Sequence, residues 1–145
     1  MTNPQQEQAQ RERLRRLAER VTDEQLATPL GEHWTVSVAL AHMAFWDRRV
    51  VAQLAKWERD GRGPEPGDTI DSEVINDASL AQWRALARRA ALQEVLEAAE
   101  ACDHAVATAD ARLIDAVIRQ QGPFTLPRAV HRAEHLDQIE RAIGS

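Results

Sequence analysis

Two histidines near the end of the chain, His131 and His135, are four residues apart in the segment from Val130 to Ile143. If this segment is an α-helix, residues at that spacing share one face, with their Cβ atoms about 5–6 Å apart. Two imidazoles placed in this way can bind one divalent cation, provided that a third ligand comes from elsewhere in the fold. His42, in the apolar run from Val36 to Val51, is the candidate for that third ligand.

These histidines also have interpretations that need no metal. Five histidines scattered over this chain give some i,i+4 pair by chance about one time in seven. His42, taken alone, is explained by a core histidine that hydrogen-bonds to a neighbour. His33 and His104 belong to no pattern, and we expect both to be exposed.

A metal held by three neutral imidazoles would keep at least one coordination position open, as in catalytic zinc sites. Water or a thiol in that position can lose its proton near neutral pH and become a nucleophile. Zinc and nickel are the expected ions, because both suit imidazole nitrogen ligands. The histidines therefore predict metal-dependent nucleophilic chemistry.

Glu134 and Gln138 are the candidate catalytic residues beside this metal. Glu134 completes the pattern H-x-x-E-H of inverted zinc peptidases, in which the glutamate is a general base, but those enzymes need a much larger scaffold. We therefore consider that Glu134 orients His131 or assists proton transfer, while an exposed helix position without a role explains it equally well. Gln138 lies at nearly the same angle around the helix as His131 and is the better candidate for orienting a ligand.

Trp46 and Asn76 are the candidate cofactor-binding or substrate-binding residues. Trp46 follows His42 by one helical turn and could form the wall of a pocket, although an aromatic residue at this spacing is more often part of the core. Asn76 is either a polar group in that pocket or the cap at a helix break near residues 77–79.

Apolar residues recur at helical spacing along most of the chain, and no segment shows the alternation of a strand. We predict long helices over residues 5–21, 36–60, 70–108 and 127–143, with a short additional helix over 109–120. Thr35 is a suitable N-cap, and the glycine–proline cluster at residues 61–67 closes the second helix. The pattern predicts an all-α four-helix bundle, in a single domain that spans residues 1–145.

The composition excludes several other classes of protein. A net charge of −5 argues against nucleic acid as a partner. Arginines and glutamates alternate in the first helix, which predicts a solvated face with salt bridges. Cys102 is the only cysteine, so no internal disulfide forms, and we expect it to be a small buried side chain. We find no signal peptide and no apolar run that could span a membrane, which predicts a cytoplasmic protein.

The motifs also carry a resemblance to a known family. They are Trp34-Thr35-Val36, His42, Trp46-Asp47, Ile75-Asn76 and the run H-x-x-x-H-x-x-Q-I that begins at His131. Over nearly the whole chain they resemble the DinB-like family, which is sometimes grouped with mycothiol-dependent maleylpyruvate isomerases. That family comprises four-helix bundles with a divalent metal on one histidine of the second helix and two of the fourth. The resemblance therefore implies His42, His131 and His135 as ligands.

The resemblance also implies a class of reaction. Relatives include transferases that use a low-molecular-weight thiol, such as mycothiol or bacillithiol, and hydrolases of strained electrophiles. We therefore expect a thiol-dependent S-transferase, isomerase or hydrolase that acts on a small electrophile. The arginine-rich composition, with Lys56 as the only lysine, is typical of a GC-rich genome and favours mycothiol.

The alternative is a stress-associated helical homodimer that binds metal without turnover. Self-association is expected in either case. Trp57 and Trp83 are interpreted as apolar residues on the outer surface, which a second copy of the chain would cover.

Overall fold

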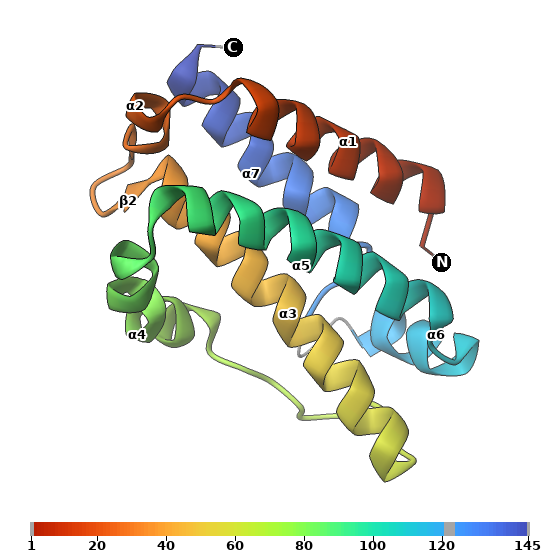
Figure 1. Cartoon of the computed structure of the whole chain (residues 1–145). Coiled ribbons are helices and arrows are strands. Elements are labelled where there is room, and N and C mark those ends of the chain that lie inside the picture. The colour runs from red at the N-terminus through yellow and green to blue at the C-terminus, as the bar shows by residue number, and fades with distance from the viewer. Residues whose placement is uncertain (1, 121–123, 145) are drawn as a thin grey trace.

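The computed structural model describes residues 2–120 and 124–144. Four long helices run side by side along the molecule (Figure 1): α1 (Pro4–Arg20), α3 (Val36–Asp60), α5 (Arg88–Thr108) and α7 (Arg128–Ile143). The short additional helix is α6 (Ala111–Gln120), at the end of the bundle where α5 finishes. The predicted all-α four-helix bundle is therefore confirmed.

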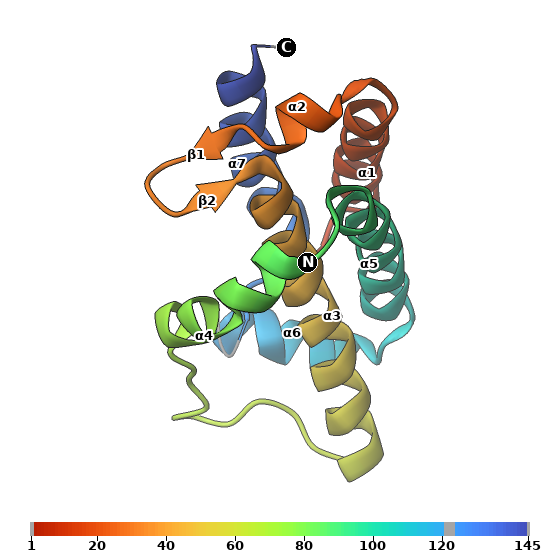
Figure 2. The same ribbon diagram turned by 60° about the vertical axis from the view of Figure 1, so that its left-hand side comes forward.

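A small hairpin and a short helix join α1 to α3. Helix α2 (Asp23–Leu26) is followed by strands β1 (Pro29–Leu30) and β2 (Trp34–Thr35), which pair antiparallel beside α7 (Figure 2). The expectation of no strand was wrong at this place, because two residues are too few to show an alternating pattern. The hairpin leads directly into α3, since Thr35 is both the end of β2 and the N-cap of the helix.

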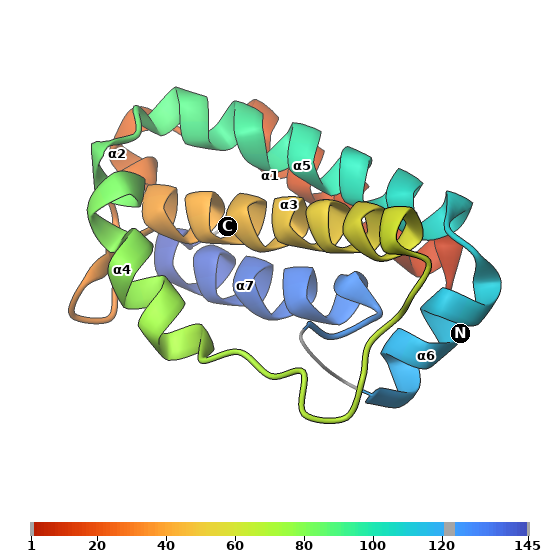
Figure 3. The ribbon, with the colours of Figure 1, turned by 90° about the horizontal axis from the view of Figure 1, so that it is seen from below.

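Both predicted ends of α3 are confirmed. The Thr35 hydroxyl accepts a hydrogen bond from the amide of Val38 at 3.2 Å. Gly61 ends the helix at φ +67°, a conformation that side chains disfavour. Segment 61–71 then runs back along the molecule to α4 (Ser72–Ala85), which lies across the side of the bundle (Figure 3).

The helix predicted over residues 70–108 is two helices, α4 and α5, and the break lies at Leu86 and Ala87 rather than at residues 77–79. Tertiary packing explains the position, because Trp83 is buried against Val38 of α3 at the end of α4. The N-cap of α4 is Asp71, so Asn76 lies inside that helix. The interpretation of Asn76 as a cap was therefore wrong.

Helix α3 is apolar on most sides, and it lies at the centre, with its most extensive packing against α5. Trp57 near its end is 1% exposed, and Trp83 of α4 is 6% exposed. The placement of these two tryptophans on the outer surface was wrong, since both pack into apolar clusters. Self-association stays a prediction, without the support that these residues were expected to give.

The charged face of α1 is only in part solvated. Arg15 and Glu12 form an exposed ion pair within the helix, as predicted. In contrast, Arg13 donates to Glu140 of α7 at 2.9 Å, and Glu7 is buried. The alternation of charges therefore serves partly to join α1 to its neighbours.

The remaining expectations concern single residues and the membrane. Cys102 is fully buried, and His33 and His104 are exposed, as predicted. No helix in the described ranges has the length and apolar character that a membrane crossing requires.

Candidate metal centre

His131 and His135 lie on successive turns of α7 and point toward α3. Their ring centroids are 4.6 Å apart. The ring of His42, from the middle of α3, lies 4.8 Å from His135 and 5.6 Å from His131. One nitrogen of each ring lies within 4.8 Å of the others. The structure therefore brings together the three histidines that were predicted as ligands, and they could hold a divalent metal.

All three imidazoles are kept neutral by their surroundings. Burial lowers the pKa of His42 to about 3, and repulsion between a protonated His42 and a protonated His135 adds to the effect. Burial also lowers the pKa of His131 to about 2, helped by the Arg128 guanidinium, and lowers the pKa of His135. Because a metal binds a neutral imidazole, these rings are in the charge state that ligation requires at neutral pH.

The hydrogen bonds of two of the rings also fit a metal. His42 Nδ1 is buried and has no hydrogen-bond partner among the described residues. A buried polar atom of this kind costs free energy unless a ligand or a water molecule binds it. His135 Nδ1 lies 3.2 Å from Oε1 of Gln138, and because an amide oxygen can only accept, Nδ1–H donates this hydrogen bond. Nε2 of His135 is then free to coordinate.

A cavity of about 470 Å³ opens beside the histidines. Trp46 and Phe124 provide apolar wall, and Asn76 and Thr125 provide polar groups. Trp46 Nε1 donates to Asn76 Oδ1 at 2.8 Å, which joins α3 to α4 across the cavity wall. Both residues predicted to bind a cofactor or substrate therefore line the space next to His42.

A comparison with known families agrees with this geometry. The model of the DinB superfamily matches residues 6–138, which include the three histidines and the cavity residues. The chain belongs to the DinB superfamily. No curated protein and no solved structure gives a significant match.

Of the two predicted catalytic residues of this DinB-superfamily protein, Gln138 contacts a histidine ring, whereas Glu134 is exposed. Gln138 contacts His135 rather than His131, the ligand that its helical angle favoured. Glu134 is exposed, and its negative charge raises the pKa of His135 against the larger effect of burial. A catalytic role for either residue stays a prediction.

Sequence reasoning missed two arginines of α7 that lie beside the histidines. Arg132 is fully buried and donates to Asp47 at 3.1 Å and to Asp103 at 2.8 Å. Arg128 is also buried, and its Nε donates to Asp47 at 3.0 Å. Arg132 reaches Glu7 of α1 as well, at 3.1 Å, and burial raises the pKa of that carboxyl.

This network joins α7 to α1, α3 and α5, and so fixes how α7 is rotated about its axis. Since His131 and His135 are on the same helix, the network also holds them toward α3. Two features of the sequence could have indicated it. Arg128 and Arg132 have i,i+4 spacing next to the histidines, and Asp47 is a carboxylate inside the most apolar helix.

Proposed function

We propose that this DinB-superfamily protein is a divalent-metal-dependent enzyme that transfers a low-molecular-weight thiol, such as mycothiol, or water to a small electrophile. The observation that carries the proposal is the meeting of three neutral imidazoles, one buried and two half-buried, beside a cavity that His42 and His131 line. A zinc or nickel ion on His42, His131 and His135 would supply Lewis acidity, which favours the deprotonated form of a thiol or water.

The chain's own residues would bind and orient the reactants. The cavity, of about 470 Å³, suits a small molecule and not a polymer. Trp46 and Phe124 would contact the apolar part of the electrophile. Asn76 fixes the Trp46 ring through their hydrogen bond, and so sets the width of the cavity beside His42.

Gln138 would hold His135 in the tautomer that leaves Nε2 unprotonated. Glu134 lies one residue before this ligand and would contribute its negative charge, which opposes the effect of the Arg128 guanidinium on the pKa of His135. Neither residue needs to touch the substrate for these roles.

The experiment begins with untagged protein, whose bound metal is measured by mass spectrometry. Loaded protein is then incubated with mycothiol or bacillithiol and a panel of small electrophiles, and products are identified by their mass. We expect product formation that needs metal and is lost in His42→Ala but kept in His104→Ala, whose histidine is exposed. If the protein binds metal stoichiometrically but forms no product with any thiol or with water, the proposed enzymatic activity would be contradicted. That result would support a protein that binds metal without turnover.

A further inference from the structure

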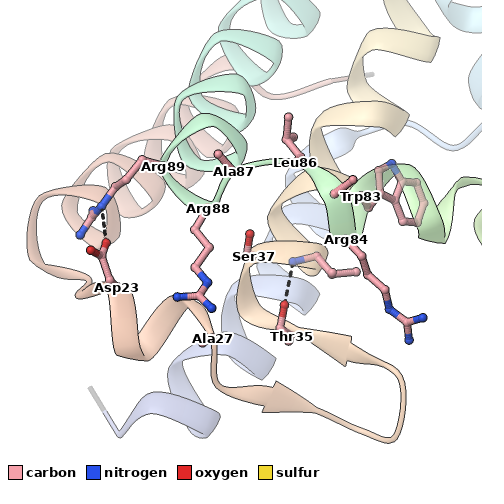
Figure 4. A pocket seen from close by; sticks show the side chains of 12 residues that line it. Asp23, Ala27, Thr35, Ser37, Trp83, Arg84, Leu86, Ala87, Arg88 and Arg89 are labelled. Atoms are coloured by element: carbon pink, nitrogen blue, oxygen red, sulfur yellow. Dashed lines mark hydrogen bonds and ion pairs between the residues drawn. The ribbon is translucent and has the colours of Figure 1, made fainter.

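A second cavity, of about 630 Å³, lies at the junction of α4 and α5, where the chain turns at Leu86 and Ala87 (Figure 4). Three arginines line it, Arg84, Arg88 and Arg89, against one acidic residue, Asp23. This is a local excess of positive charge in a chain whose net charge is −5. An excess of this kind favours an anionic ligand.

Two of these arginines already have partners, and one does not. Arg89 donates to Asp23 at 2.8 Å, and Arg84 donates to the carbonyl oxygen of His33 at 2.7 Å. Arg88 forms no hydrogen bond or ion pair with any other residue in the described part of the chain. Its guanidinium extends from α5 toward Ala27, over the cavity (Figure 4). All the donors of Arg88 are therefore available to a ligand.

Ser37 supplies an independent sign of a ligand. Its side chain is at the start of α3, is only 5% exposed, and points into the cavity (Figure 4). The hydroxyl makes no hydrogen bond to another described residue. This hydroxyl is therefore available to form a hydrogen bond with a ligand in the cavity.

The start of α5 adds further donors. The helix begins at Arg88, and Ala87 in the cap position has no side chain that could accept from the first amides. The amides of Arg88, Arg89 and Ala90 have no acceptor within the described residues. Free amides at the positive end of the helix dipole are suited to bind an oxyanion.

We propose that this cavity binds a small molecule through a phosphate group. The phosphate would take hydrogen bonds from the Arg88 guanidinium, the first amides of α5 and the Ser37 hydroxyl. A group with several acceptor oxygens in tetrahedral arrangement fits donors that come from separate directions better than a planar carboxylate does. The cavity is larger than a phosphate, and Trp83 and Leu86 offer apolar surface to an organic part.

The site is distinct from the metal centre but adjacent to it. Trp83 lines this cavity, and its ring centroid lies 5.4 Å from that of His42. A bound phosphate would therefore be separated from a metal ligand by one aromatic side chain. The proposal does not depend on metal binding or on the proposed reaction.

The test is a titration of the ¹⁵N-labelled, metal-free full chain with inorganic phosphate, followed by amide NMR. Glycerol phosphate is titrated in parallel, and sodium chloride at matched ionic strength is the reference. We expect the amide resonances of Arg88, Arg89 and Ala90 to shift saturably with phosphate and not with chloride. Arg88→Gln should weaken the affinity at least tenfold, the loss expected for charge-assisted hydrogen bonds.

Matched variants separate binding from folding. Ser37→Ala should weaken the affinity severalfold, and Arg88→Lys should keep part of it by keeping the charge. Arg59→Gln removes an exposed arginine of α3 and should leave the affinity unchanged. The melting temperature of Arg88→Gln should equal that of the parent, because Arg88 forms no hydrogen bond or ion pair with the residues that the structure describes.

The result also identifies the type of phosphate. Tighter binding of glycerol phosphate would assign the site to organic phosphate monoesters, and equal binding would assign it to the phosphate group alone. An equal response to chloride, or an Arg88→Gln variant that binds as the parent does, would overturn the proposal.

Discussion

The side chains of Arg128 and His131 meet with guanidinium Nη2 3.0 Å from imidazole Nδ1. A guanidinium can only donate, so Nδ1 accepts, and the proton of the neutral ring is on Nε2. Coordination of a metal through Nε2 requires the opposite tautomer, with the proton on Nδ1. This hydrogen bond and coordination through Nε2 of His131 therefore exclude one another.

We predict that Arg128→Gln binds zinc about tenfold more tightly than the parent. The substitution removes a positive charge beside the site, and the amide oxygen of glutamine can accept a hydrogen bond from the Nδ1–H group of His131. Competition with a chromophoric chelator measures the affinity. Asp47 keeps Arg132 as a partner, so the metal-free fold should persist. Weaker zinc binding by this variant would show that Arg128 supports the metal instead of opposing it.

The metal should stabilise the protein only when all three histidines are present. At one hundred times its dissociation constant, a ligand that binds only the folded state adds about 2.7 kcal/mol to the free energy of unfolding. We predict that His42→Ala, His131→Ala and His135→Ala each largely lose the rise in melting temperature that zinc or nickel causes. Differential scanning fluorimetry with and without metal measures it.

The exposed histidines are the controls for this experiment, since neither lies near the three rings. His33→Ala and His104→Ala should respond to metal as the parent does. A full response in His42→Ala would mean that α3 supplies no ligand. The group of three imidazoles from α3 and α7 would then not be the metal site.

The same histidines should make the metal-free protein sensitive to acid. Burial lowers the pKa of His42 from 6.5 to about 3 and that of His131 from 6.5 to about 2. Between pH 6.5 and about 3 the unfolded chain therefore binds protons that the folded chain does not, and the free energy of unfolding decreases as the pH falls. We predict that unfolding of the metal-free protein in urea becomes easier throughout this window.

A variant of the central histidine tests the cause. His42→Leu removes one of the depressed pKa values, so its stability should decline less steeply with acid than that of the parent. His104→Ala should follow the parent curve. Identical acid curves for His42→Leu and the parent would remove this explanation.

Removal of the buried arginine of α7 should be severely destabilising. Arg132→Met leaves Asp47, Glu7 and Asp103 without their shared partner, and breaking a buried ion pair in this way costs about 3–5 kcal/mol. The matched control is Arg15→Met in the exposed pair with Glu12, where a loss below about 1 kcal/mol is expected. Urea denaturation of both variants compares them, and a similar small loss in each would show that the network contributes little.

Several features followed from local chemistry alone. His131 and His135 share a face because residues four apart always do so on a helix. Thr35 begins α3 and Gly61 ends it because capping involves only neighbouring residues. The all-α class and the central position of α3 were predictable for the same reason. The helical spacing of apolar residues can be recognised within one continuous stretch of sequence.

Other features had no local signal. The chain turns at Leu86 and Ala87 without glycine or proline, because burial of Trp83 against α3 sets the end of α4. The sequence likewise could not show that Trp57 is buried, since an apolar side chain has the same spacing whether it faces the core or a second molecule.

The tertiary structure alone decided the remainder of the metal centre. His42 is distant in sequence from the α7 pair, and only the packing of α3 beside α7 brings its ring within reach of theirs. The burial of Arg128 and Arg132 depends on carboxylates from three other helices. An arginine in a helix has the same appearance in sequence whether it is solvated or paired in the core, because its partners come from segments that only the folded chain brings together.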